Sequence, residues 1–341
     1  MGWLTAAWLI GVGVAAAPAD EPDLKRFQFT QVEMAVPIRI VLYSTDATTA
    51  SSAARAAFAR IHHLNAVLSD YDPQSELRRL CNTATGGEGI PVSDDLWRVL
   101  SHAQTLAERS EGAFDVTIGP VVRLWRRARR QRELPSSDRL RAARELVDYR
   151  LIQMNPQDGT VELLKPEMRL DLGGIAKGYA ADEALAVLKK SGINRALIDA
   201  GGDIVLSAPP PGTSGWKIGV ARLEADGPPS QVLSLADVAI ATSGDTWQYV
   251  EIDGRRYSHI VDPRTGLGLT DHSSVTIIAP DGMTADALAS AVSVLGPKQG
   301  LKLIGNTPGA AALIVRAPDG QLESHRSSRW KDVPLASTVD R

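Results

Sequence analysis

The sequence predicts an α+β fold, in which helices and strands are partly segregated along the chain. Residues 45–148 are mostly helical in pattern, whereas the chain after Asp148 changes to short strands joined by glycine turns. No regular strand–helix–strand repeat appears, which disfavours a doubly wound parallel sheet. The 341 residues, 44% of them hydrophobic, can bury a substantial core, and this length suits one large domain or two lobes.

The first half of the chain is expected to begin with a strand or hairpin and to continue through a series of helices. Residues 27–43 alternate between apolar and polar side chains, which is the period of a half-buried strand. Most of the following helical stretches begin after a residue whose side chain can accept a hydrogen bond from a free backbone N–H group of the first turn. These stretches run from Thr45–Asp46 to about Leu68, from Ser93 through Leu106, from Gly119 to Arg130, and onward from Ser136–Ser137.

The second half is expected to contain short strands, two helices and two hairpins. Expected strands include residues 195–199, 202–206 and 216–220. Asp253–Gly254 lies between two such segments and is a strong hairpin signal. Helices at about 283–294 and 297–305 precede a last hairpin around Asp319–Gly320. We expect residues 18–330 to form a single domain and residues 331–341 a loose tail.

Residues 1–17 are interpreted as a signal peptide. The stretch from Trp3 to Ala17 is apolar, uncharged and followed by Pro18, and its length suits a signal-peptide core better than a membrane span. No Lys or Arg precedes it, so a fortuitously apolar start of a cytosolic chain is the alternative. Cys81 is the only cysteine; it cannot form an intramolecular disulfide and lies too far along the chain to carry a lipid anchor. We therefore expect an exported, periplasmic protein. We also expect the Cys81 side chain to be packed in the interior.

The charge pattern gives no sign of a nucleic-acid partner. The net charge of −3 provides no general attraction to nucleic acid or to an anionic membrane. The basic run at residues 123–132 is predicted to be the solvated face of a helix that continues into Glu133, Asp138 and Glu145. Phosphate-binding P-loop, dinucleotide-binding and Cys/His zinc patterns are all missing from the sequence.

The segment from Asp171 to Asp182 is the most informative feature of the sequence. It is interpreted as the end of a strand, residues 168–172, which breaks at Gly173–Gly174 and starts a helix that carries Lys177. The glycines let the backbone approach a ligand closely, and the free N–H groups at a helix start attract an anion, most naturally a phosphate. Taken alone, this pattern fits a functional site and a plain turn equally well.

Two further clusters contain residues suited to catalysis. His259 ends a predicted strand, and its pKa near neutrality suits it to take a proton from a hydroxyl. Asp286 and Ser290 are four residues apart on a predicted helix, so their oxygens share one face. A carboxylate and a hydroxyl suit Mg²⁺, but spacing alone favours a helix cap near Asp286 and a solvated Ser290.

Six ordered motifs together resemble the ApbE family, the Mg²⁺-dependent FAD:protein FMN transferases. The resemblance covers most of the chain, from about Met34 to Val315, and no single motif would be sufficient. The motifs are residues 68–77, 112–120 with 124–125, 171–182, 241–245, 259–266, and 285–290 with 295–296.

The resemblance implies an ApbE-like fold with mixed or antiparallel sheets, flanking helices and an FAD cleft between two lobes. The implied metal ligands are the Gly174 carbonyl and the side chains of Asp286 and Ser290, which makes metal binding the favoured role of that pair. Asp286 and His259, the latter as general base, are the implied catalytic residues. The implied FAD contacts are Met34, Tyr71, Ala113, Phe114, Asp115, Asp171, Lys177 and Val261.

The implied reaction is transfer of the FMN part of FAD to a Thr or Ser hydroxyl of a target protein, with release of AMP. The implied acceptors are exported subunits of redox complexes such as Nqr or Rnf, with peripheral contact to these membrane complexes. An FAD pyrophosphatase and a non-catalytic FAD-binding protein are the alternatives, and Mn²⁺ is an alternative metal.

This chain departs from the family pattern at three places. Residues 34–36 are Met-Ala-Val where members usually have Met-Gly-Thr, and Ser290 replaces the usual Thr. Leu267–Gly268 replace an aromatic residue and a proline.

Overall fold

An eight-stranded antiparallel sheet forms the centre of the computed structural model, which describes residues 23–83, 87, 89–223, 227–246 and 248–336. Every pair of neighbouring strands in this sheet runs antiparallel. In sheet order the strands are β1 (Lys25–Glu33), β2 (Val36–Ser44), β6 (Ala196–Ala200), β7 (Asp203–Leu206), β10 (Ala239–Gly244), β13 (Ser273–Ala279), β14 (Ala311–Arg316) and β15 (Glu323–Arg326).

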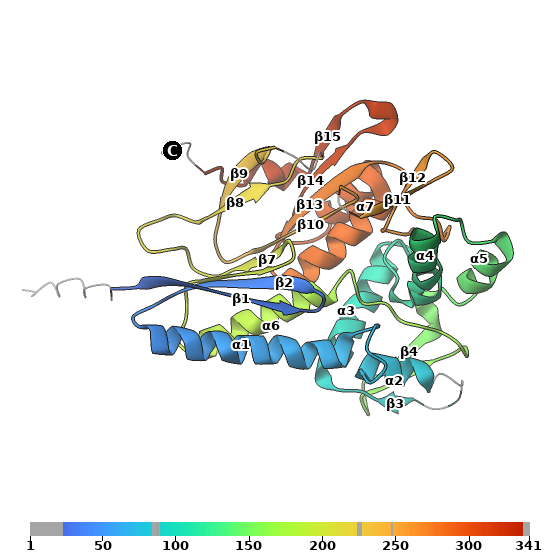
Figure 1. Ribbon diagram of the computed structural model, residues 1–341, viewed down its shortest axis with the longest axis horizontal. Coiled ribbons are helices and arrows are strands. Elements are labelled where there is room, and N and C mark those ends of the chain that lie inside the picture. The colour runs from blue at the N-terminus through green and yellow to red at the C-terminus, as the bar shows by residue number, and fades with distance from the viewer. Residues whose placement is uncertain (1–22, 84–86, 88, 224–226, 247, 337–341) are drawn as a thin grey trace, which may run out of the picture.

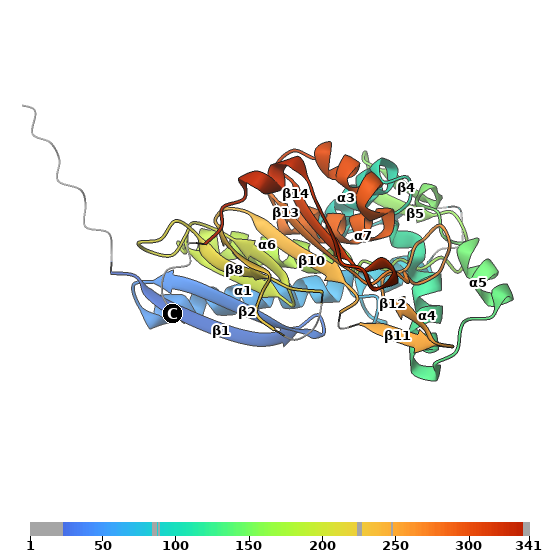
Figure 2. The same cartoon turned by 90° about the horizontal axis from the view of Figure 1, so that it is seen from above.

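Three long helices cover one face of this sheet, and a two-stranded ribbon covers part of the other (Figures 1 and 2). The alternation of side chains along β2 explains this arrangement, because Ile40 and Leu42 enter the core beneath the helices while Val41 packs with Trp216 on the opposite side. The helices are α1 (Ala47–Leu68), α6 (Ala176–Lys190) and α7 (Gly282–Gly305). The ribbon is β8 (Trp216–Val220) with β9 (Gln231–Leu235), beside which lies the short helix η4 (Ser328–Asp332).

The remaining elements lie around the end of the sheet where α4 and α5 are seen in Figure 1. They include a small three-stranded sheet in the order β3–β5–β4 and the hairpin β11–β12. A separate apolar cluster, which includes Trp125, Val250 and Tyr257, joins α4 to that hairpin. The elements are α2 (Glu76–Asn82), β3 (Ile90–Pro91), α3 (Asp94–Arg109), η1 (Val116–Ile118), α4 (Gly119–Gln131), α5 (Ser137–Arg144), η2 (Tyr149–Leu151), β4 (Ile152–Asn155), β5 (Thr160–Leu163), β11 (Tyr249–Ile252), β12 (Arg255–Ser258) and η3 (Pro318–Gly320).

The predicted α+β class, the helix starts and both hairpins are confirmed. Asp46 accepts a hydrogen bond from the Thr49 N–H at 2.9 Å at the start of α1, and Ser93 likewise caps α3. Cys81 is buried, as expected, and burial raises the pKa of its thiol. The two helices predicted near the C-terminus are the two parts of α7, which is interrupted where Gly296 has a φ of 68° before Pro297.

Two predictions about local structure are wrong. Residues 168–172 do not form a strand; Met168, Leu170 and Leu172 are buried, so their alternation reflects packing against the core. The basic helix does not continue to Glu145, because α4 ends at Gln131 and Arg132 turns the chain with a left-handed φ of 57°.

The two chain ends were expected to be a signal peptide and a loose tail. Residues 1–17 lie outside the described residues, so the signal peptide stays a prediction. Within the expected tail, the Ala336 N–H donates to the Val232 carbonyl at 2.8 Å and Leu335 pairs with Leu233, so residues 334–336 are held along β9. Residues 337–341 lie outside the description. In the part of the chain that is described, no helix is long and apolar enough to cross a membrane.

Candidate active site

The turn that precedes α6 and the first turn of α6 itself pack against α7 through contacts that only glycine allows. A Cβ atom on Gly178 would stand 2.1 Å from the carbonyl oxygen of Gly282, at the start of α7. A Cβ atom on Gly174 would stand 2.7 Å from the Ser290 hydroxyl oxygen. Both distances are far shorter than an ordinary contact, so the missing side chains let the backbone of the turn and of the first turn of α6 touch α7. As a result, Gly174 lies directly beside Ser290.

Asp286 joins the same place from the facing side of α7. Its carboxylate is buried and accepts a hydrogen bond from the Gly178 backbone N–H at 3.1 Å. Its Oδ2 atom lies 3.6 Å from the Lys177 ammonium. The structure therefore gathers the three residues implied as metal ligands, Gly174, Asp286 and Ser290, with Lys177 beside them. That they bind a metal stays a prediction.

Lys177 lies between two buried carboxylates, those of Asp203 and Asp286. Its ammonium donates a short hydrogen bond to Asp203, the first residue of β7. Burial disfavours the charged ammonium, but the attraction of Asp286 and Asp203 outweighs it and raises the pKa of Lys177. Burial and the like charge of Asp286 raise the pKa of Asp203 to about 7. Sequence reasoning missed Asp203; a second glycine pair directly before it is the one local signal.

A second group of charged residues surrounds Asp171. The Arg126 guanidinium on α4 donates to Asp171 at 2.8 Å, pairs with Asp70, and lies 4.1 Å from the centre of the Tyr71 ring. Burial and the like charge of Asp70 raise the pKa of Asp171, and Arg126 opposes that shift. Arg126 was predicted to be part of a solvated helix face, and this is wrong, because folding brings it against both carboxylates.

Tyr71 offers an open aromatic face next to this group. The side chain is 72% exposed, which is unusual for so large an apolar surface. Arg126 covers part of the ring by a cation–π contact, and the same arginine binds Asp171. Because the Gly173 N–H also donates to Asp171 at 2.9 Å, the turn at residues 171–174 connects the Tyr71 group to the Gly174–Ser290 contact.

His259 is held by one ring nitrogen, and the other has no hydrogen-bond partner among the described residues. Its Nδ1 atom lies 3.1 Å from the Gln248 carbonyl oxygen, which can only accept a hydrogen bond, so Nδ1 carries the proton and Nε2 is left as the acceptor. Burial lowers the pKa of His259, and the cationic Arg129 and Lys177 lower it further. The imidazole is therefore neutral at pH 7 and can take a proton at Nε2.

The loop 113–115 provides the wall behind Gly174. The Phe114 ring is buried, and its Cε2 atom would lie 3.5 Å from a Cβ placed on Gly174. Asp115 accepts hydrogen bonds from the Thr117 N–H and hydroxyl at 2.8 and 2.6 Å and thereby starts η1. Burial raises the pKa of Asp115. Ala113 is buried as well. The contacts of this loop with FAD stay a prediction.

Among the described residues, Met34 and Val261 take part in neither of these two groups of contacts. Met34 occupies the β1–β2 turn with a left-handed φ of 50° and packs on the main core. Val261 is buried in the cluster of α4 and β11–β12 and pairs with Gly268. This pairing closes the turn at residues 262–266, and the Trp125 indole donates to the Gly266 carbonyl at 2.8 Å. Both FAD contacts stay predictions.

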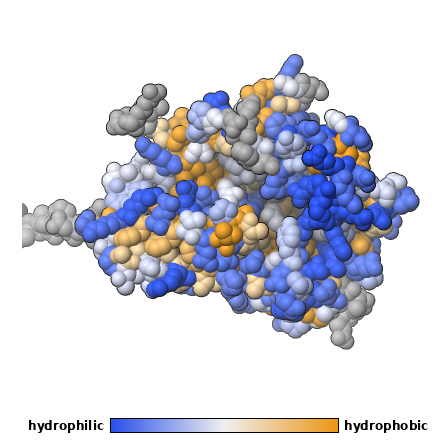
Figure 3. Space-filling model, viewed as in Figure 1, coloured by the Kyte–Doolittle hydropathy of each residue, from blue (hydrophilic) through white to orange (hydrophobic). Residues whose placement is uncertain are grey.

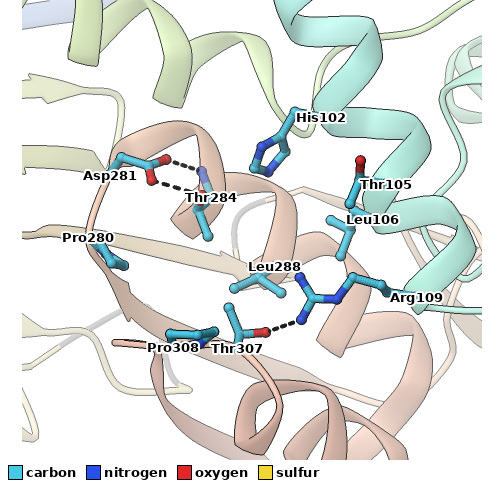
Figure 4. A pocket seen from close by; sticks show the side chains of 10 residues that line it. All are labelled: His102, Thr105, Leu106, Arg109, Pro280, Asp281, Thr284, Leu288, Thr307 and Pro308. Carbon is cyan, nitrogen blue, oxygen red and sulfur yellow. Dashed lines mark hydrogen bonds between the residues drawn. The ribbon is translucent and has the colours of Figure 1, made fainter.

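A cavity of about 180 Å³ lies elsewhere, between α3 and the start of α7 (Figure 4). In Figure 4, His102 and Arg109 point toward it from α3, and Arg109 bonds to the Thr307 hydroxyl at 2.6 Å. Thr284 and Leu288 line it from a face of α7 different from the one that carries Asp286 and Ser290. None of the residues predicted to contact FAD lines this cavity, and an FAD cleft between two lobes stays a prediction.

The residues at the turn suit a magnesium ion. Ser290 and Asp286 supply a hydroxyl and a carboxylate, hard oxygen donors on one helix face, and the Gly174 backbone lies against Ser290. Any Cβ at position 174 would fill the space between them. Among the described residues, no three His, Cys, Asp or Glu side chains converge on a point. A site built of one carboxylate with neutral oxygens is the kind that Mg²⁺ completes with water and phosphate.

The glycine turn, the buried lysine and the oxygen donors on one helix meet at the junction of a sheet and two helices, and their chemistry suits a phosphate-bearing ligand. Comparison with known proteins is more specific. The sequence model of the ApbE family matches residues 34–314, and the chain belongs to this family.

Relatives and solved structures agree with this assignment. The chain is 33% identical to an FAD:protein FMN transferase of Treponema pallidum over 90% of its length and 88% of that relative. It is 34% identical to that of Vibrio cholerae, over 80% and 81% of the two chains. Its structure superposes on an ApbE protein of Thermotoga maritima with a TM-score of 0.81 and 31% identity, covering 91% and 99%. For the flavin transferase ApbE of Vibrio cholerae, with the same coverage, the TM-score is 0.79 at 28% identity.

Proposed function

We propose that this protein transfers the FMN moiety of FAD to a Thr or Ser hydroxyl of a target protein, with Mg²⁺, and releases AMP. Relatives named FAD:protein FMN transferase support the transfer. The proposal is supported in this chain by the junction of Gly174, Ser290, Asp286 and Lys177, where oxygen atoms suited to Mg²⁺ lie beside a buried cation.

Each residue of the junction has a distinct task in this reaction. Bound Mg²⁺ would neutralise charge on the pyrophosphate and on the departing AMP. Asp286, Ser290 and the Gly174 carbonyl would hold it. Lys177, whose raised pKa keeps it charged, would steady the phosphate oxygens, because phosphoryl transfer depends mainly on positioning and electrostatics.

The acceptor hydroxyl needs a base, and His259 fits this role. Nε2 of His259 takes the hydroxyl proton while the hydroxyl oxygen bonds to the FMN phosphorus. The bond from that phosphorus to the bridging oxygen of the pyrophosphate breaks, and the bridging oxygen leaves with AMP. The neutral imidazole with Nδ1 bound to Gln248 is prepared for this step.

Export of the chain is part of the proposal. The apolar residues 3–17 support it, and so does the family's implied link to exported subunits of complexes such as Nqr or Rnf. The proposal therefore places the protein in the periplasm, in peripheral contact with membrane complexes.

The test is AMP release from FAD by the purified chain with Mg²⁺, with and without the soluble domain of an Nqr-type subunit. We expect AMP together with a gain of one FMN mass on the acceptor. AMP with free FMN alone would instead identify a pyrophosphatase. Bound FAD without AMP would identify a flavin carrier and overturn the proposal.

A matched pair of variants tests the metal ligands. Ser290→Ala removes an implied ligand, whereas Ser293→Ala removes a hydroxyl whose hydrogen bond among the described residues stays within α7, to the Ala289 carbonyl at 2.8 Å. We expect Ser290→Ala to raise the Mg²⁺ concentration needed for half-maximal activity by at least about tenfold. Asp286→Ala should abolish transfer, and Ser293→Ala should change neither. Full Mg²⁺-dependent activity in Asp286→Ala would show that the metal assignment is wrong.

A further inference from the structure

Helix α4 carries a line of arginines that the proposed reaction does not use. Arg123, Arg127 and Arg130 recur at intervals of four and three residues, so they share one face of the helix, and all three are exposed. We call these three residues the arginine stripe. Figure 3 shows a strongly hydrophilic area on the side of the molecule where α4 and α5 lie.

The positive charges of the stripe are not balanced by neighbours within the described structure. Arg126 forms ion pairs with Asp70 and Asp171, but none of the three stripe residues forms one with a described acidic residue. Like charges at these spacings destabilise a helix. The helix dipole favours Arg130 in the last turn, but it does not favour Arg123 or Arg127 further up. Helix stability alone therefore does not account for the stripe.

The stripe lies on the same rigid element as residues of the candidate active site. Arg126 falls between its members in the sequence and binds Asp171 directly. Arg129 is close enough to His259 to lower the pKa of that imidazole. The Trp125 indole fixes α4 to the turn at residues 262–266 through its bond to the Gly266 carbonyl. Arg126 and Arg129 lie on a neighbouring face of the same helix, so a partner bound along the stripe would be held on the element that also contacts the candidate active site.

We propose that the arginine stripe docks an acidic segment of the protein acceptor. This inference rests on the proposed function, because a protein substrate must be held while its hydroxyl meets FAD. The stripe spans roughly 10 Å of helix, which matches about three residues of an extended segment. Guanidinium groups form paired hydrogen bonds with carboxylates. Since the chain as a whole has a charge of −3, this local positive surface would steer an acidic partner to one side of the molecule.

The test compares two triple variants with the same change in charge. Arg123→Gln/Arg127→Gln/Arg130→Gln neutralises the stripe and keeps a good helix-forming side chain. Arg55→Gln/Lys189→Gln/Lys190→Gln is the control; these residues are exposed, lie on α1 and the last turn of α6, and form no ion pair with a described residue. Steady-state FMN transfer to the soluble domain of an Nqr-type subunit is measured at low and high salt, together with the unfolding temperature of each protein.

We expect the stripe variant to raise the KM for the acceptor by about tenfold at low salt, a difference that high salt should reduce. Its kcat at saturating acceptor, its KM for FAD and its unfolding temperature should match those of the unmodified chain. The control variant should leave the KM for the acceptor unchanged. Neutralising the acidic residues near the flavinylated residue of the acceptor should raise KM with the unmodified chain but not further with the stripe variant.

Four results would overturn the inference. An unchanged KM for the acceptor in the stripe variant would show that the arginines do not dock it. A raised KM for FAD alone would assign the stripe to FAD. Loss of binding to phosphatidylglycerol vesicles with normal acceptor kinetics would assign it to the membrane surface. If the unmodified chain transfers no FMN, the proposed function fails, and this inference fails with it. If the unmodified chain and the stripe variant transfer FMN with the same KM for the acceptor, only the docking role of the stripe is rejected.

Discussion

Replacing Lys177 by Met should destabilise the fold strongly, because it removes the cation between two buried carboxylates. Asp203 and Asp286 are 6% and 5% exposed, so neither can recover solvation by water when the ammonium is lost. Removing one partner of a buried ion pair costs about 3–5 kcal/mol. For a chain of 341 residues that corresponds to a fall in unfolding temperature of roughly 4–7 °C.

The size of this effect should depend on pH. The pKa of Asp203 is raised to about 7, above its ordinary value of 3.8, so the ionised carboxylate costs stability in the folded state. Stability from this group is therefore present at low pH and is lost as pH rises through about 7. In the unmodified chain the Lys177 ammonium stabilises the ionised carboxylate of Asp203. The free energy of unfolding lost in Lys177→Met should therefore be larger near pH 8 than near pH 5.5.

The assay is thermal unfolding by calorimetry at both pH values, in the presence of a chelator so that metal binding does not contribute. The double variant Lys177→Met/Asp203→Asn removes one of the stranded charges and should recover about 2 kcal/mol. An unfolding temperature for Lys177→Met within about 1 °C of the unmodified chain would refute the reasoning, because it would mean that the charges are not stranded. An equal penalty at both pH values would refute the electrostatic cause.

Three further predictions concern the turn, the base and the β1–β2 hairpin. Gly174→Ala should abolish measurable Mg²⁺ binding by calorimetry, because its Cβ would stand 2.7 Å from the Ser290 hydroxyl; Gly305→Ala, with open space around it, should bind normally. The rate of FMN transfer should fall on the acid side as His259 becomes protonated, with its midpoint below the ordinary value of 6.5, because burial lowers this pKa. Ala35→Gly should raise the free energy of unfolding by about 1 kcal/mol in urea titrations, because Ala35 has a left-handed φ of 63° that costs glycine little.

Each of these predictions has an outcome that contradicts it. Normal Mg²⁺ affinity in Gly174→Ala would mean that this backbone is not part of the metal site. An acid limb that persists in His259→Gln would assign the titration to another group. A less stable Ala35→Gly would mean that the side chain contributes more by packing than its backbone strain costs.

Local chemistry was sufficient to predict much of this fold from the sequence. Helix starts at Asp46 and Ser93 and the hairpin at Asp253–Gly254 are decided by residues within a few positions, so the sequence contains all the information they need. The same holds for the interruption of α7 before Pro297. Gly296 can adopt a positive φ, and Pro297 has no N–H group to continue the helical hydrogen bonds. The six ordered motifs are likewise a property of the sequence, and their order was specific enough to indicate the family.

Burial decided the features that the sequence did not. The alternation at residues 168–172 is the same whether its apolar side chains meet a neighbouring strand or the core, and only packing made it an irregular segment. Likewise, a helix with many arginines has a solvated face by every local rule, yet folding placed Arg126 against Asp70 and Asp171, which are distant in sequence.

The site itself combines both kinds of information. The sequence by itself determined which chemical groups exist: a glycine pair before a lysine, a carboxylate and a hydroxyl one helical turn apart, and a histidine after a strand. Tertiary structure alone decided that Gly174 touches Ser290, that Asp203 shares Lys177 with Asp286, and that His259 keeps Nε2 free. The physical reason is that contacts between distant segments, and the pKa shifts that follow from burial, depend on the packing of α6 against α7 and the sheet.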